Sequence, residues 1–175
     1  GGSAGDVTIT GAATLDTGAI TIDTSAGNGA VKFTSTLDGA DGTARALTIK
    51  SGTGKVTFDG VIGGVDNKPL GALTVNAGGD DSSGTIEITD IGDGGSVGTG
   101  AASIGNSATT DIILDGALYK TGGSTVFTTT SGNNIKMTRT AGAGTTQFTL
   151  ANQTLEFATG TILLSNDVDL NMNTG

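Results

Sequence analysis

The chain has 175 residues and a formal net charge of −9 at pH 7, with 32 glycines but no cysteine and no histidine. The absence of Cys and His excludes disulfide frameworks, zinc fingers, histidine-based catalytic triads and His- or Cys-ligated haem. The eight basic residues are scattered singly, which disfavours nucleic acid as a partner because binding to the phosphate backbone needs clustered Lys and Arg.

Composition also bears on location and on the core. The acidic, cysteine-free, Thr/Gly-rich sequence is typical of bacterial secreted surface proteins, so we expect an extracellular or cell-surface location. The longest apolar run, residues 162–164, is far shorter than the ~20 residues of a membrane-spanning helix, which predicts no membrane insertion. The sequence begins with Gly and shows no signal-peptide pattern, and we interpret it as a processed or excised segment of a larger precursor.

Alternation of apolar and polar residues dominates the chain and predicts short, half-buried strands separated by Gly, Asn, Asp and Ser turns. An aromatic fraction of 3% favours a narrow core of Val, Ile and Leu. In chain order, the expected strands cover residues 7–10, 20–23, 31–34, 47–50, 56–59, 73–76, 86–89, 112–114, 125–128, 135–138, 147–150, 155–157, 162–164 and 168–170.

Two series of these strands repeat along the chain. The first is spaced by 27 and 26 residues, and the second by 25 and 30 residues. An imperfect repeat of this length, with insertions confined to Gly/Asp loops, is typical of stacked β-solenoid coils. We therefore predict an all-β fold, a β-solenoid (parallel β-helix), with a β-sandwich as the alternative. The series begin at Ile20, Leu47 and Leu73, and at Val31, Val56 and Ile86.

The repeat suggests three parts of the chain. Residues 1–91 form repetitive β-coils of about 26 residues. Residues 92–100 are rich in Gly and Ser and read as a loop or junction. Residues 101–175 form further β-coils in which the repeat is degenerate.

One stretch of the first part resembles a known family. Residues 56–64 read VTFDGVIGG, and residues 69–75 read PLGALTV. This pattern resembles the repeats of filamentous-haemagglutinin-like and autotransporter-like bacterial adhesins over residues 20–90. The resemblance implies a surface-exposed or released β-helical stalk used for adhesion or filament building, and it carries over no catalytic residue.

Acidic residues in Gly-rich loops are the candidate metal ligands: Asp80, Asp81, Asp90 and Asp93. Calcium prefers carboxylate and carbonyl oxygens of this kind, whereas the competing interpretation is that Asp-Gly pairs simply form turns. The sequence contains neither an EF-hand loop nor the GGxGxDxUx calcium repeat. Calcium is the one cofactor that the sequence brings into consideration.

The residues bear on two further activities, ice binding and carbohydrate hydrolysis. Thr-x-Thr pairs such as Thr8 and Thr10 resemble an ice-binding ladder, but Asp59-Gly60 interrupts it. A carbohydrate-active β-helix enzyme would need two carboxylates in a cleft, and the chain has few aromatics for sugar stacking. We therefore expect no catalytic residues and no enzyme.

Neither terminal segment reads as a polar cap, since residues 6–10 and 168–170 are both strand candidates. Uncapped strand edges are templates for pairing with another chain. We predict an extracellular structural protein that self-assembles into a filament or surface array. The first alternative is an adhesin stalk that binds a glycan or cell-surface ligand, and a more distant one is a carbohydrate-active enzyme.

Overall fold

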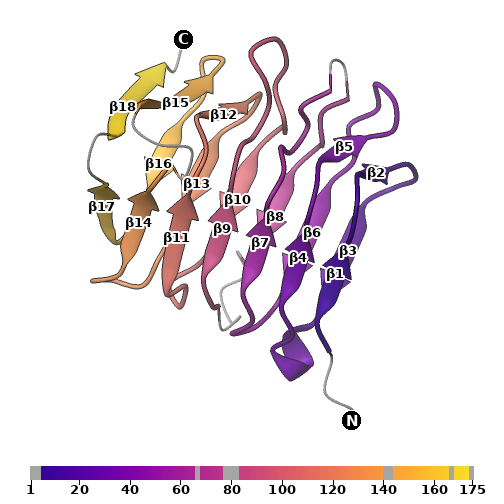
Figure 1. Ribbon diagram of the computed structural model, residues 1–175, viewed down its shortest axis with the longest axis horizontal. Coiled ribbons are helices and arrows are strands. Elements are labelled where there is room, and N and C mark those ends of the chain that lie inside the picture. Colours follow the sequence, from indigo (N-terminus) through magenta and orange to yellow (C-terminus); the bar gives the residue numbers. More distant parts are fainter. Residues whose placement is uncertain (1–4, 66–67, 77–82, 140–143, 166–167, 174–175) are drawn as a thin grey trace.

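The computed structural model describes residues 5–65, 68–76, 83–139, 144–165 and 168–173. Parallel strands stack side by side from the N-terminal end to the C-terminal end of the molecule (Figure 1). The first face holds β1 (Val7–Ile9), β4 (Val31–Phe33), β7 (Val56–Phe58), β9 (Ile86–Ile88), β11 (Asp111–Leu114), β14 (Asn134–Met137) and β17 (Thr161–Leu164).

The chain passes two more faces in every turn. The second face holds β2 (Ala13–Leu15), β5 (Leu37–Gly39), β12 (Leu118–Thr121), β15 (Gly144–Leu150) and β18 (Val168–Asn173). The third face holds β3 (Ile20–Asp23), β6 (Leu47–Lys50), β8 (Leu73–Val75), β10 (Ala102–Ile104), β13 (Thr125–Phe127) and β16 (Leu155–Phe157). A short 3-10 helix, η1 (Ser25–Gly27), lies in the turn between β3 and β4. The result is a β-solenoid of about 6 turns.

The register confirms the predicted repeat. Ile20 pairs with Leu47, and Leu47 pairs with Leu73, on the third face. The second predicted series, which begins at Val31, is aligned in the same way on the first face. Because parallel coils stack in register, the spacing between equivalent residues is the length of one coil. Every strand pair among the described residues is parallel, so the β-sandwich alternative, which requires antiparallel sheets, is wrong.

Strand alternation places one row of residues inside each face, and the rows form a continuous core. On the first face the inward residues of the middle coils are fully buried, as at Val56, Ile86 and Ile112. No single coil has enough apolar surface to form a core alone, so stacking is what removes these rows from water.

The few aromatic side chains stack from coil to coil. Phe33 lies on Phe58 with ring centroids 5.1 Å apart, and Tyr119 lies on Phe148 at 5.0 Å. In-register pairing places equivalent residues next to each other, so a ring in one coil meets a ring in the next. Every aromatic residue except the half-buried Phe157 is buried.

The second face carries one inward column through all of its levels. Ala13 pairs with Leu37 at the N-terminal end, and single-residue bridges then link Leu37 to Ile62, Ile62 to Ile91 and Ile91 to Tyr119. The column continues through Phe148 to Met172. Four strands were not predicted from the sequence: β2, β5 and β12 of this face, and β10 of the third face. β2, β5 and β10 include Ala, Asp or Gly where strands usually carry β-branched residues. β12 reads LYKT and alternates between half-buried and buried residues, so it was missed although its pattern is that of a strand.

The backbone of residues 92–100 takes part in the stacking. The Leu70 amide donates to the Gly98 carbonyl at 2.9 Å, and the Gly98 amide donates to the Lys120 carbonyl at 2.9 Å. The third face continues across this segment of the sequence. β8, which precedes residues 92–100, pairs with β10, which follows them, and β10 pairs with β13.

A buried polar corner joins the third face to the first. Asn76 adopts a left-handed conformation, with φ of 47°, and its Oδ1 accepts the Ser51 amide at 2.8 Å. Its Nδ2 donates to the hydroxyls of Ser51 and Ser83, and its carbonyl accepts from Asn106 Nδ2 at 2.7 Å. Because buried polar groups are costly unless paired, this network holds the turns of three successive coils in position.

Candidate functional site at the two ends of the solenoid

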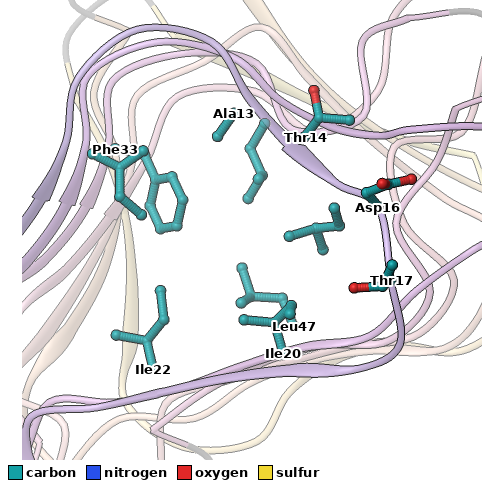
Figure 2. Close-up of a pocket in the computed structure, with 11 residues that line it drawn as sticks. Ala13, Thr14, Asp16, Thr17, Ile20, Ile22, Phe33 and Leu47 are labelled. Atoms are coloured by element: carbon teal, nitrogen blue, oxygen red, sulfur yellow. The ribbon is translucent and has the colours of Figure 1, made fainter.

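The N-terminal end of the solenoid is an open apolar hollow. A cavity of about 350 Å³ lies between the strands of the first two coils. Side chains of Ala13, Ile20, Ile22 and Phe33 surround it, and their inward orientation is visible in Figure 2. Ala13, Ile20 and Ile22 occupy inward positions, yet they are only half-buried. We name this feature the N-terminal hollow.

The C-terminal end presents projecting apolar side chains. Ile162, Leu163 and Leu164 of β17 are 41%, 43% and 45% exposed, and Met172 of β18 is 57% exposed. Three of them, Ile162, Leu164 and Met172, continue inward rows of the preceding coils. We name these three residues the C-terminal row.

Comparison with the preceding coil shows why these residues are exposed. Ile162 pairs with Ile135, and Met172 pairs with Phe148. Ile135 and Phe148 are at most 1% exposed, because a coil covers them on each side. The residues of the C-terminal row have a coil on one side only. Unpaired strand edges and an uncovered core therefore coincide at each end of the described chain.

The structure describes two of the four predicted calcium ligands, Asp90 and Asp93. Asp80 and Asp81 lie outside the described residues. Asp90 Oδ1 accepts the amides of Ala117 and Leu118, both at 2.8 Å. Among the described residues no three carboxylates come close enough to hold a metal ion.

Asp93 organises its own turn. Its Oδ1 accepts the amides of Gly95 at 2.7 Å and Ser96 at 2.6 Å. These two bonds, with a smaller contribution from Lys120, lower the pKa of the Asp93 carboxyl below its usual value. Asp90 thus links neighbouring coils and Asp93 shapes a loop, as expected of Asp residues in turns.

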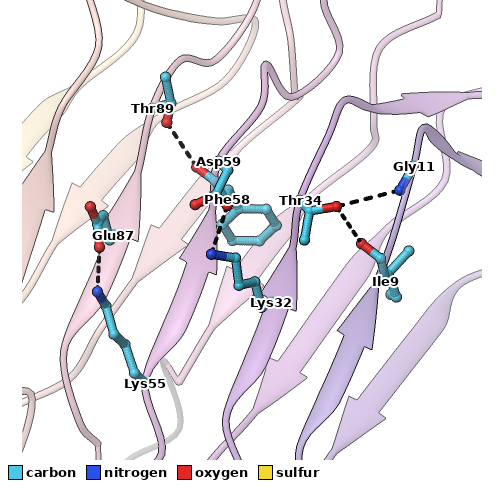
Figure 3. A network of polar contacts seen from close by, with 9 residues as sticks. All are labelled: Ile9, Gly11, Lys32, Thr34, Lys55, Phe58, Asp59, Glu87 and Thr89. Atoms are coloured by element: carbon cyan, nitrogen blue, oxygen red, sulfur yellow. Dashed lines mark hydrogen bonds and ion pairs between the residues drawn. The ribbon is translucent and has the colours of Figure 1, made fainter. Parts of the chain in front are cut away.

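Ion pairs connect coils on the first face. Lys32 contacts Asp59 at 2.7 Å, and Lys55 pairs with Glu87, one coil further along (Figure 3). Both pairs are substantially exposed, so each contributes little to stability. Thr8 aligns with Lys32, so a charged residue interrupts the threonine row on this face.

No aromatic side chain of the chain is exposed as a platform for sugar stacking. Tyr119 donates its hydroxyl to the Ile88 carbonyl at 2.9 Å and accepts the Gly116 amide at 3.0 Å. Burial raises the pKa of this phenol well above its usual value. The only tyrosine of the sequence is therefore part of the buried core.

Strands at both ends are predicted from the sequence, but Ala13 and Met172 are not among the predicted residues. The available signal was the alternation of Val168, Leu170 and Met172, which extends the predicted strand at 168–170 by one more inward position. Ala13 gave no such signal, because a small residue between Ala12 and Thr14 does not mark an apolar position in an alternating pattern.

Comparisons with known proteins add no family. No family model matches the sequence, and no match was found among curated proteins or solved structures. Within the described part of the chain, no helix has the length and apolar character needed to cross a membrane. The class defined by the fold is the β-solenoid.

Proposed function

We propose that this chain is a stiff structural segment of an extracellular surface or filament-forming protein, and that it assembles through its exposed strand edges. The observation that carries the proposal is the pair of open ends. Each end combines unpaired strands with apolar side chains at inward positions that the middle coils bury completely. The resemblance to filamentous-haemagglutinin-like and autotransporter-like repeats supports the same role.

The fold suits a mechanical role. Sheets on the first and third faces run along the molecule, and neighbouring coils are joined by backbone hydrogen bonds on each face. Bending such a rod would strain bonds on several faces at once. The seven strands of the first face span roughly 29 Å, at about 4.8 Å per strand spacing.

The test is assembly of the purified chain without any added ligand. Sedimentation velocity and negative-stain electron microscopy over a wide range of concentrations should show rods that lengthen as the concentration rises. A protein that stays monomeric at the highest soluble concentration, with no filaments on the grid, would refute the proposal.

An adhesin stalk is the second candidate, and one hollow on the second face favours it. A cavity of about 210 Å³ is lined by polar groups of Asp93, Lys120, Gln147 and Thr149. A carboxylate, an ammonium, an amide and a hydroxyl together offer the donors and acceptors that a glycan requires. Glycan-array binding that is lost in Gln147→Ala, but kept in filament-deficient variants, would favour this role.

A further inference from the structure

We propose that the partner of each open end is a second copy of this chain, stacked head to tail, with the C-terminal row of one copy inserted into the N-terminal hollow of the next. This inference rests on the proposed function and specifies its polarity and register. In the joint, β17 pairs with β1 of the next copy and β18 pairs with β2, all in parallel.

The register within the chain defines the joint. On the first face an unbroken series of pairings runs from Val7 of β1 to Ile162 of β17. A second copy placed at the next level of this series brings its Val7 beside Ile162 and its Ile9 beside Leu164. The same step continues the column of the second face, so that Ala13 of the next copy lies beside Met172.

The two ends differ in shape in the way that such a joint needs. The C-terminal end has a large side chain, Met172, at the end of the second-face column, where it is 57% exposed. The N-terminal end has a small one, Ala13, beside a hollow of about 350 Å³. Placing a large residue opposite a small one fills space at close to native packing density. Met is also the apolar side chain that adapts best to an irregular gap.

Joining two C-terminal ends is the competing geometry, and it lacks this match. It would place one Met172 and one β17 against another, large residue against large, and it would leave the N-terminal hollow empty in both copies. The strands would also have to pair antiparallel, whereas every strand pair in the described part of the chain is parallel. A twofold contact of this kind closes a dimer, whereas the head-to-tail contact continues as a filament.

The head-to-tail joint is carried by two of the three faces. The first face has seven strands and the third face has six, because the chain enters on the first face and its last strand lies on the second. One strand position on the third face therefore stays open between β16 and β3 of the next copy. Each copy then advances the filament by seven strand spacings, roughly 34 Å at about 4.8 Å each.

The test uses two variants that each block one end. Ala13→Glu places a charge at the N-terminal hollow, and Met172→Glu places one at the C-terminal row. Both sites are partly exposed, and circular dichroism melting at low concentration checks that each variant folds. The matched controls, Thr8→Glu on β1 and Asn171→Glu on β18, add the same side chain at exposed, outward positions of the terminal strands.

Head-to-tail stacking predicts that each blocked variant is monomeric alone, that their mixture forms a 1:1 dimer without further growth, and that both controls form filaments like the unmodified chain. Filaments of the unmodified chain should show an axial repeat of about 34 Å. Homodimers of Ala13→Glu would overturn the inference in favour of joined C-terminal ends, and the absence of a dimer in the mixture would overturn it as well. A monomeric unmodified chain would instead refute the proposed function itself.

Discussion

Two equivalent isoleucines in neighbouring coils separate the effect of burial from that of residue type. Ile135 and Ile162 are paired on the first face, yet Ile135 is fully buried and Ile162 is 41% exposed. Substituting either by alanine removes the same three carbon atoms. At Ile135 the lost transfer free energy is about 2.5 kcal/mol, at about 0.8 kcal/mol per CH₂. The residual cavity raises the total to roughly 3–4 kcal/mol.

At Ile162 the expected loss is much smaller. A substantial part of the side chain is already in water, and no closed cavity forms at the open end, so the loss is about 1 kcal/mol. Urea unfolding followed by far-UV circular dichroism, on dilute protein, measures both free energies. Equal losses in the two variants would show that the last coil is covered, and would refute the reasoning from open ends.

The same pair also reports on assembly. If a second copy covers the C-terminal row, the cost of Ile162→Ala should rise with protein concentration, because the joint buries that side chain. The cost of Ile135→Ala should stay constant, because this residue is buried in the monomer. A concentration-independent cost at Ile162, under conditions where filaments are present, would place the joint elsewhere.

Three further predictions concern packing and charge. Gly116→Ala should destabilise the fold by about 2–4 kcal/mol in urea unfolding, because a Cβ at this position would lie 1.5 Å from the Thr89 carbonyl oxygen. The control Gly94→Ala should have little effect, because a Cβ there would have no heavy atom within 4 Å. Assembly should strengthen between about 0.01 and 1 M salt, because screening reduces repulsion between copies of charge −9, and sedimentation showing the reverse would contradict an apolar joint. Hydrogen bonds from Arg45 and the Thr43 amide lower the pKa of the Asp41 carboxyl to about 2. The stability that these bonds add is therefore present above about pH 4 and is lost as the pH falls towards 2. The melting temperatures of the unmodified chain and of Asp41→Asn should converge over that range.

Much of the fold could be predicted because, in a solenoid, residues that lie next to each other in space recur in the sequence at intervals of one coil. The 27- and 26-residue steps from Ile20 to Leu47 and on to Leu73 are the lengths of whole coils, so the repeat alone reported which residues lie side by side. The glycine and Asp turns that interrupt the pattern marked the corners. This worked best on the first and third faces, where strands such as β4, β6 and β8 alternate between buried and half-buried residues.

Between residues 37 and 91 the second face escaped prediction because no alternation of buried and exposed residues marks it. Leu37, Asp38 and Gly39 of β5 are all buried, and the Asp38 carboxylate is satisfied by the Val65 amide at 3.2 Å. In the next two coils this face is reduced to single bridges at Ile62 and Ile91. A period-two pattern cannot be recognised in one residue, so only the neighbouring coils reveal that a strand position is occupied.

The candidate calcium ligands likewise show what the sequence reveals and what only the stacked coils reveal. Asp90 and Asp93 stand three residues apart in a Gly-rich loop, and that spacing suits a metal as well as a turn. The structure shows what each carboxylate contacts: Asp90 accepts amides from a residue pair 27 and 28 positions away, whereas Asp93 caps its own loop. The stacking of coils brings the amides of Ala117 and Leu118 to Asp90, and no local sequence pattern predicts this contact.

The sequence by itself determined the architecture: all-β, a coil of about 26 residues, and a core of small apolar side chains, because alternation and spacing are local properties of the chain. Tertiary structure decided which identical residues are covered and which are not. Ile135 and Ile162 look alike in sequence, and so do the strands around them, but one has a coil on both sides and the other has a coil on one. Burial depends on that neighbour, so the open ends, the hollow at Ala13 and the projecting Met172 became visible only when the coils were stacked.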